Sequence, residues 1–243
     1  DVYRKNAEPL SRPSDYLLYI LMFPQLIAGP IVKAHEFVKQ IQNKKFSSID
    51  WALVTRSLVV GFFLKMVVAD NLKDATVLLN TVDLSSMTKL NLIALYYGYS
   101  FQIFADFAGY SLIAIGLGAM FGYQLPVNFN FPYISQSLTE FWQRWHISLS
   151  SWLREYLYIP LGGNRKGALR TYLNLMLVML LGGLWHGAGW NYMMWGGIHG
   201  LFLAVERMLA TRVRVKFSGW WIGLIKTFWV FHVVSTLWLL FVM

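Results

Sequence analysis

Long stretches of this chain carry almost no charged side chains, and this feature limits the possible folds more than any other. Between 90 and 139 the one charged residue is Asp106, and none occurs from 171 to 205. Lys226 alone interrupts 217–243. A membrane-spanning helix needs about 20 apolar residues, which each stretch exceeds. Charged residues make up 14% of the chain, against about 25% in soluble domains. The sequence therefore predicts an all-α, polytopic transmembrane helical bundle.

The remaining segments predict less regular elements. Pro24, Gly29 and Pro30 interrupt the apolar segment 16–32, which we expect to be a re-entrant or broken helix. Four other segments are assigned from their composition: a basic loop over 33–50, a mixed helix over 51–79, one tilted span or two short spans broken near Gly116 and Gly118 over 90–121, and a loop or interfacial crossing over 122–137.

Segment 138–158 has a different pattern. Its apolar residues recur every three or four positions, from Phe141 to Leu157, which is typical of an amphipathic helix. Three tryptophans and mixed charge suit the boundary between lipid headgroups and hydrocarbon. We therefore expect one amphipathic helix in or just below the interface, ended by the Pro, Gly and basic residues of 160–167.

The uncharged segment 171–205 predicts a helical hairpin. As one straight helix its 35 residues would span about 52 Å, too long for a hydrocarbon core of about 30 Å. Basic clusters flank it at 165–170 and 207–216, and both belong on the cytoplasmic side if the positive-inside rule holds. Two helices of about 15 residues, each about 22 Å long, would then turn at His186–Trp190. His186 would lie at the tip, below the far surface.

The net charge of +9 has two interpretations. A basic surface can bind nucleic acid or another acidic ligand. Short cytoplasmic loops of membrane proteins also gather Lys and Arg, and the basic residues cluster in such loops here. We favour membrane topology as the explanation.

Histidines are the main candidates for chemistry, because an ionisable residue inside a bilayer is costly and usually functional. A neutral imidazole at His186 could take a proton from a hydroxyl and return it to a leaving group, although a hydrogen-bonded packing histidine is the alternative. His146 could polarise a carbonyl or orient a second proton. His199 lies thirteen residues after His186, a spacing that can hold haems only with a matching partner helix, which the sequence does not offer.

Other chemistries lack their motifs. The chain has no cysteine and no His-x3-His pair, so neither thiolate catalysis nor a zinc site is expected. No Gly-x-Ser is completed to a nucleophile elbow, and Gly162–Gly167 is not a P-loop. Its basic side chains could still hold the phosphates of coenzyme A, or form an ordinary positive-inside loop. Asp106 predicts either an ion pair with an Arg or His of another segment, which we favour, or a proton path.

Several motifs together resemble one family. These are Pro24–Pro30 (PQLIAGP), Asp106–Ser111 (DFAGYS), Glu140–Ser150 (EFWQRWHISLS), Trp152–Arg165 (WLREYLYIPLGGNR) and Leu181–Gly187 (LGGLWHG). The combination resembles the membrane-bound O-acyltransferase family, in the bacterial branch that includes the alginate O-acetyltransferases. The motifs extend over nearly the whole chain, as expected for a single domain over 1–243. Family members are about twice this length, so we expect a fragment truncated at both ends.

The resemblance implies roles for individual residues. His186 matches the family's catalytic histidine and His146, forty residues earlier, its second active-site residue. We expect substrate or acyl-donor binding by Trp145, Arg154, Asn164, Arg165 and Asp106, and no metal or bound cofactor. The implied donor is acetyl-coenzyme A, which would enter a membrane tunnel from the cytoplasm of a bacterial cell with the protein in its inner membrane.

The acetyl group would pass to a periplasmic or extracellular partner protein or polysaccharide of alginate type. Alternatives within the family are O-acetylation of peptidoglycan or cellulose and D-alanylation of teichoic acid. Outside it, the chain could be a non-catalytic scaffold subunit of an export complex or a haem-binding electron carrier.

Overall fold

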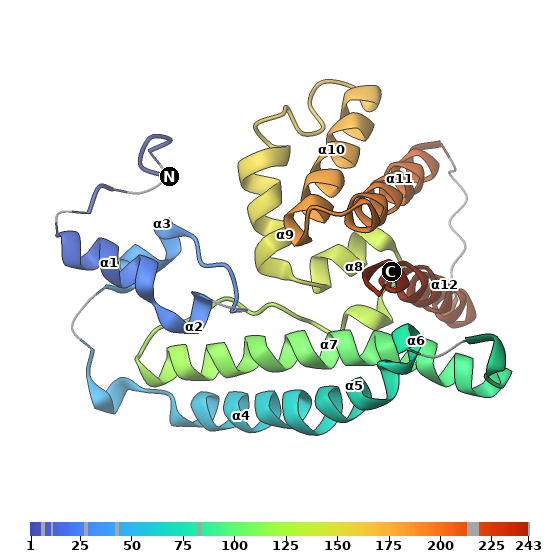
Figure 1. Cartoon of the computed structure of the whole chain (residues 1–243). Coiled ribbons are helices and arrows are strands. Elements are labelled where there is room, and N and C mark those ends of the chain that lie inside the picture. The colour runs from blue at the N-terminus through green and yellow to red at the C-terminus, as the bar shows by residue number, and fades with distance from the viewer. Residues whose placement is uncertain are drawn as a thin grey trace. The chain divides into compact units, whose positions relative to one another are not determined.

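A computed structural model describes residues 1–5, 8–10, 12–26, 29–41, 44–81, 84–212 and 219–242. Every regular element in these ranges is helical (Figure 1). Of the basic residues used above, Arg214 and Lys216 lie outside them. The chain forms two compact units, one of 1–73 with 101–128 and one of 74–100 with 129–243. Each unit is described by itself.

The first unit begins with the broken helix that the sequence predicts. Helix α1 (Pro13–Leu21) ends at Met22, and the short α2 (Phe23–Leu26) follows. The predicted basic loop contains one short α-helix, α3 (Ala34–Phe37), and single 3-10 turns at Val38–Gln40 and Phe46–Ser48. A small apolar core lies beneath these elements and includes Met22, Phe37, Ile115 and Tyr123.

Two long helices pair in the first unit. Helix α4 (Trp51–Phe62), capped by the Asp50 carboxylate, continues through a π-helical segment at Phe63–Ala69 into α5 (Asp70–Thr76). Helix α7 (Lys89–Met120) has no break, so 90–121 is one span, about 48 Å long. Its part from residue 101 onward belongs to this unit and runs beside α4 (Figure 1). Gly61 and Gly109 face each other, and a Cβ at either would lie about 2.9 Å from the opposite helix. Small residues therefore let these backbones approach closely.

The predicted amphipathic helix over 138–158 is divided into three parts. Helix α8 (Leu138–Arg144), capped by Ser137, ends before His146, and α9 (Ile147–Leu153) then leads into a π-helical turn at Arg154–Tyr158. The division occurs because His146 is in the left-handed region, with φ 44° and ψ 54°. Apolar periodicity continues through such a break, so the continuous helix was an incorrect expectation.

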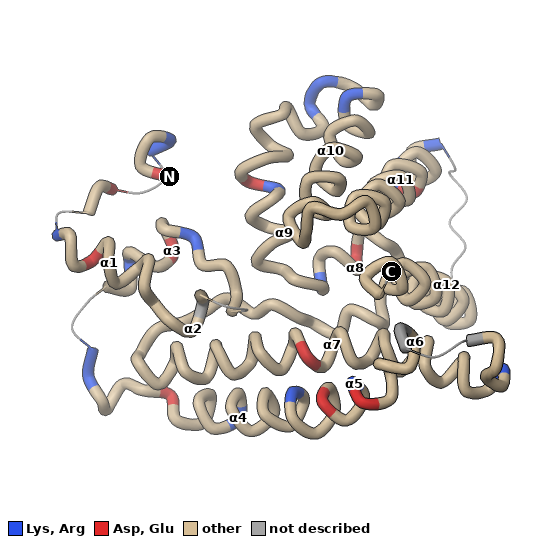
Figure 2. The backbone as a smooth tube through the Cα atoms, in the orientation of Figure 1, with Lys and Arg blue, Asp and Glu red and all other residues tan. Residues whose placement is uncertain are grey.

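The helical hairpin is confirmed, with longer arms than expected. Of its two arms, the first alone is among the helices that are apolar enough to span a membrane in the described part of the chain. Helix α10 (Ala168–His186) and α11 (Trp190–Arg212) run antiparallel. At 19 and 23 residues they are about 28 and 35 Å long, not 22 Å. A Cβ at Gly183 would meet the Tyr192 carbonyl, and one at Gly196 would meet the Met179 carbonyl. The two glycines thus bring the arms into backbone contact, and the basic residues on either side of the hairpin lie at its open end (Figure 2).

Helix α12 (Trp220–Trp238) completes the second unit, together with the short α6 (Leu78–Thr81). Within the residues that the structure describes, four continuous helical segments are long and apolar enough to cross a membrane, namely Trp51–Thr76, Lys89–Met120, Ala168–His186 and Trp220–Phe241. This agrees with the predicted multi-span bundle. The segment from 171 to 205, on both sides of the hairpin turn, has no Asp, Glu, Lys or Arg and is drawn tan in Figure 2.

Candidate functional site

His186 is the last residue of α10, next to the hairpin turn. Its ring meets Trp195 and Phe241 edge to face, each at a centroid distance of 5.3 Å, and Trp185 at 5.1 Å. The described residues give its nitrogens no hydrogen-bond partner. The imidazole is thus held by aromatic contacts while both nitrogens stay available to a substrate.

A cavity of about 120 Å³ adjoins His186. Its wall is mainly aliphatic and is contributed by α9, α10 and α11, with Leu149, Leu153, Val178, Met179, Gly182 and Leu203 among its members. Trp142, Ser150 and Trp195 add the other polar atoms. A small apolar group could therefore lie beside a titratable ring, against mainly aliphatic side chains.

His146 lies at the break between α8 and α9 and is 3% exposed. Trp185 is 6.2 Å from its ring, so one tryptophan contacts both candidate histidines. Burial lowers the pKa of His146 to about 3, and the nearby His186 contributes in the same direction. His146 is therefore neutral at ordinary pH. Its left-handed backbone is a costly conformation for a non-glycine residue, and such strain concentrates at functional sites.

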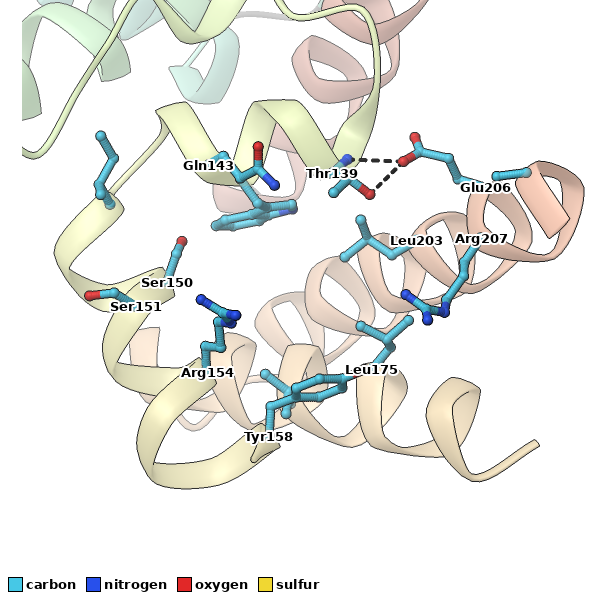
Figure 3. A pocket seen from close by; sticks show the side chains of 14 residues that line it. Thr139, Gln143, Ser150, Ser151, Arg154, Tyr158, Leu175, Leu203, Glu206 and Arg207 are labelled. Carbon is cyan, nitrogen blue, oxygen red and sulfur yellow. Dashed lines mark hydrogen bonds between the residues drawn. The ribbon is translucent and has the colours of Figure 1, made fainter. Parts of the chain in front are cut away.

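A second, larger pocket of about 580 Å³ lies beside the first. Trp142, Ser150, Val178 and Leu203 line both spaces, so the two adjoin. Arg154, from the π-helical turn after α9, and Arg207, from α11, extend toward it from opposite walls (Figure 3). The arrangement places two guanidinium groups in the pocket that adjoins the His186 cavity.

Glu206 joins the wall of the larger pocket to α8. Its carboxylate accepts hydrogen bonds from the backbone N–H groups of Leu138 and Thr139, at 2.7 and 3.1 Å, and from the Thr139 hydroxyl (Figure 3). A carboxylate is favourable at a helix N-terminus. Glu206 thus ties α11 to the helix that leads into His146.

The other predicted binding residues are placed elsewhere. Trp145 is buried among Phe141, Trp238 and other aromatic rings and lines neither pocket. Asn164 and Arg165 are exposed on the loop before α10, outside both linings. That loop is fastened by the buried Asn174 amide, which donates to the Gly163 carbonyl at 2.9 Å.

Asp106 belongs to the first unit, on α7. Its carboxylate accepts a hydrogen bond from the Lys65 ammonium at 2.6 Å, and Asp70 accepts from the same ammonium at 2.7 Å. An ion pair within the bundle was one of the two expectations for Asp106, and the pair is present, with a lysine as the partner.

The structure adds residues that the sequence did not single out. Trp142 and Ser150 line both pockets, and Arg207 faces Arg154. Arg207 had been assigned to a topology cluster, and helical position alone does not show which basic residue faces a pocket. His199 is fully buried, with Trp142 at 5.2 Å and Trp195 at 4.8 Å from its ring. Among the described residues, no three His, Asp or Glu side chains gather as metal ligands.

The chain is similar in sequence to a known protein family and to several curated proteins. The model of the MBOAT, membrane-bound O-acyltransferase family, matches residues 5–243. The chain is 46% identical to the probable alginate O-acetylase AlgI of Pseudomonas putida over 209 residues, which are 86% of this chain and 43% of that protein. It is 42% identical to the peptidoglycan O-acetyltransferase of Helicobacter pylori over 91% of this chain and 44% of the relative.

A more distant relative is the teichoic acid D-alanyltransferase of Bacillus subtilis, which is 32% identical over 82% of this chain and 52% of its own length. The chain thus spans about half or less of the length of the relatives it matches. The family match includes both histidines, both pockets and all four apolar helices. This chain is therefore part of a multi-span membrane protein and belongs to the membrane-bound O-acyltransferase family.

Proposed function

We propose that this chain carries the catalytic centre of a membrane-embedded O-acyltransferase. It transfers an acetyl group from a cytoplasmic thioester donor, acetyl-coenzyme A, to an exported cell-surface polysaccharide, directly or through a partner protein. The single observation that carries the proposal is the joined pair of pockets, one ending at His186 and the other lined by Arg154 and Arg207. The names of the relatives support acyl transfer to a cell-envelope polymer.

His186 acts as general base and then as general acid. Its neutral imidazole takes the proton of the acceptor hydroxyl while the oxygen attacks the acyl carbonyl carbon. A carbon–oxygen bond forms, the carbon–sulfur bond of the thioester then breaks, and the imidazolium returns the proton to the leaving thiolate. No oxidant, reductant or metal is needed to balance the reaction.

The other groups position the reactants. Arg154 and Arg207 bind the donor's phosphates, because guanidinium groups pair well with phosphate oxygens. The linking section of the donor then extends past Trp142 and Ser150 to bring the thioester to His186. His146, neutral and buried, orients the acceptor hydroxyl or the carbonyl by a hydrogen bond. Asn164 and Arg165 lie on the exposed loop and assist capture of the anionic donor electrostatically.

The proposed location is the bacterial inner membrane, with the open end of the α10–α11 hairpin on the cytoplasmic side. Arg165, Lys166 and Arg170 precede α10, and Arg207 and Arg212 end α11, as the positive-inside rule requires of a cytoplasmic end. An alginate-type polysaccharide is the proposed acceptor. Peptidoglycan and teichoic acid, the polymers named for two relatives, are the acceptors to compare with it.

The test is His186→Asn in the complete native protein, with O-acetyl esters on the exported polymer measured by mild alkaline release. Loss of a general base should reduce transfer by about 10²- to 10⁴-fold at an unchanged protein level. His35→Asn is the matched control, since His35 lies in the first unit and pairs only with Asp1 and Glu36 in the ion pairs found. Full acetylation with His186→Asn would contradict the proposal and favour a non-catalytic scaffold.

A further inference from the structure

The composition of the His186 cavity indicates which part of a substrate it holds. Six of its ten lining residues are aliphatic side chains or glycine: Leu149, Leu153, Val178, Met179, Gly182 and Leu203. A sugar would place several hydroxyl groups there, and a hydroxyl moved from water into apolar surroundings without a hydrogen bond costs about 2 kcal/mol or more. An acyl chain has no such groups, so the cavity suits the acyl group better than the acceptor.

The volume of the cavity limits the length of that group. A cavity of about 150 Å³ lined by aliphatic and aromatic side chains accommodates benzene, a molecule of six carbons. The cavity beside His186 measures about 120 Å³ and is therefore smaller than that reference. By this comparison it holds an acyl chain of about two to four carbons. A fatty acyl chain would have to extend into the adjoining larger pocket, which the donor fills in the proposed mode of binding.

Gly182 and Leu153 form the wall at which an added or removed carbon changes this space. A Cβ built on Gly182 would lie 3.4 Å from Leu153 Cδ1, an ordinary van der Waals contact, with no other neighbour within 4 Å. The next residue, Gly183, faces the other side and is in backbone contact with α11. A methyl group at Gly182 can therefore enter the cavity without separating the hairpin, whereas one at Gly183 cannot.

We propose that Gly182 and Leu153 set the acyl-chain length, so that the cavity beside His186 accepts short acyl groups and rejects longer ones. This inference rests on the proposed function, because it requires that an acyl group lies beside His186. Gly182 leaves room for the short chain, and the Leu153 side chain on the facing helix closes the space beyond it. Neither residue takes part in the proton transfers.

The experiment uses membranes that contain the complete protein and its native acceptor polymer. Acetyl-, propionyl-, butyryl- and hexanoyl-coenzyme A are supplied in turn, and the esters formed are released by mild alkali and identified by mass. The wild-type protein should transfer acetyl groups best and hexanoyl groups least. Because one misfitting methylene changes discrimination by about 10- to 200-fold, Gly182→Ala should lower the butyryl-to-acetyl ratio at least tenfold. Leu153→Ala should raise that ratio by a similar factor.

Two matched controls separate the cavity from general effects. Gly197→Ala makes the same change on α11, where the new Cβ meets only Leu180 Cδ2, at 3.3 Å, and lines neither pocket. Leu173→Ala removes an exposed leucine of α10. Both should leave the chain-length ratios unchanged. Should Gly182→Ala or Leu153→Ala unfold the protein, Leu153→Val provides a smaller enlargement with the same expected direction.

The possible negative results distinguish an error in the chain-length inference from an error in the proposed function. If acetyl transfer is normal but hexanoyl is transferred equally well, or if neither cavity variant changes the ratios, the assignment of Gly182 and Leu153 is wrong and the proposed function stands. If no acyl-coenzyme A gives esters under conditions in which the native polymer is acetylated in cells, the proposed donor is wrong and this inference falls with it.

Discussion

Two helix pairs in this molecule use the same packing device but treat their ionisable groups differently. In the first unit, Gly61 and Gly109 bring α4 and α7 together, and the Lys65 ammonium binds both Asp70 and Asp106. In the second unit, glycines bring α10 and α11 together, yet the imidazole at the end of α10 has no hydrogen-bond partner among the described residues and adjoins a cavity.

This difference distinguishes ionisable groups that stabilise a helix pair from ionisable groups that are available to a substrate. A charge that is matched by opposite charges at 2.6–2.7 Å serves the stability of the bundle, because each partner would be costly alone. A titratable ring that has no such partner among the described residues and adjoins a cavity is available to a substrate. By this criterion we propose His186 as the functional group and Asp106 as a structural one.

The largest expected effect on stability comes from widening the hairpin. A Cβ at Gly196 would collide with the Met179 carbonyl, a backbone atom that cannot turn aside. Gly196→Ala should therefore destabilise the protein by about 3 kcal/mol, at the upper end for overpacking, and reduce acyl transfer as His186 moves. Thermal unfolding in detergent, together with transfer assays, measures both effects.

The adjacent glycine provides the control for that change. Gly197→Ala meets only the end of the Leu180 side chain, at 3.3 Å, and should leave stability and acyl transfer nearly unchanged.

Gly109→Ala tests the other helix pair, because its Cβ would lie 2.9 Å from backbone atoms of α4 and of its π-helical continuation. It should lower stability while the activity of each folded molecule stays the same. Equal loss of activity in Gly196→Ala and Gly109→Ala would show that the two helix pairs do not differ in function.

Much of this fold follows from the sequence, because burial in lipid requires continuous apolar helices with internally satisfied backbones. That requirement predicts the broken helix within 16–32 and the hairpin at His186–Trp190. It leaves open whether 90–121 is one span or two, and the structure shows one. It could not give the break at His146, where a left-handed residue interrupts an otherwise helical pattern. It also underestimates the length of the hairpin arms, because α10 includes the charged Arg170 and α11 continues past Glu206 to Arg212.

The candidate site was predicted less completely. The sequence identifies His186 as a candidate because a titratable residue in an uncharged segment is unusual. His146 depended on a motif, since a histidine on an interfacial helix has a plain amphipathic explanation. The sequence does not single out Arg207, because a pocket wall depends on how helices distant in sequence pack. Trp145 lies in an aromatic cluster outside both pockets, and its binding role stays a prediction.

An intermediate effect is expected from the ion-paired cluster. Lys65→Met leaves Asp70 and Asp106 without their shared cation, and should cost about 2 kcal/mol of stability, less than a fully buried pair would lose, because the carboxylates are 47% and 43% exposed. Acyl transfer by each folded molecule should stay at the wild-type level. Thermal unfolding and transfer rates corrected for folded protein give the two measurements.

Asp106→Asn makes this prediction sharper. It keeps the shape of the side chain and leaves Lys65 paired with Asp70, so its loss of stability should be smaller than that of Lys65→Met. Were Asp106→Asn to stop acyl transfer in a protein of normal stability, Asp106 would be functional, as one of the sequence-based expectations held. The contrast between the two helix pairs would then be wrong.

The smallest effect concerns acid sensitivity at His146. Burial holds its pKa near 3 in the folded protein, whereas an unfolded histidine has a pKa of about 6.5. Below pH 6.5 the unfolded chain therefore binds more protons, and stability falls as the pH falls toward 3. Between pH 7.5 and 5.5 the loss from this one residue should be about 1.4 kcal/mol. The His146→Asn variant has no imidazole at this position to protonate, so its unfolding free energy should decline less between these two pH values than that of the wild type. Parallel declines would mean that His146 is protonated in the folded protein, and the neutral hydrogen-bonding role proposed for it would have to be abandoned.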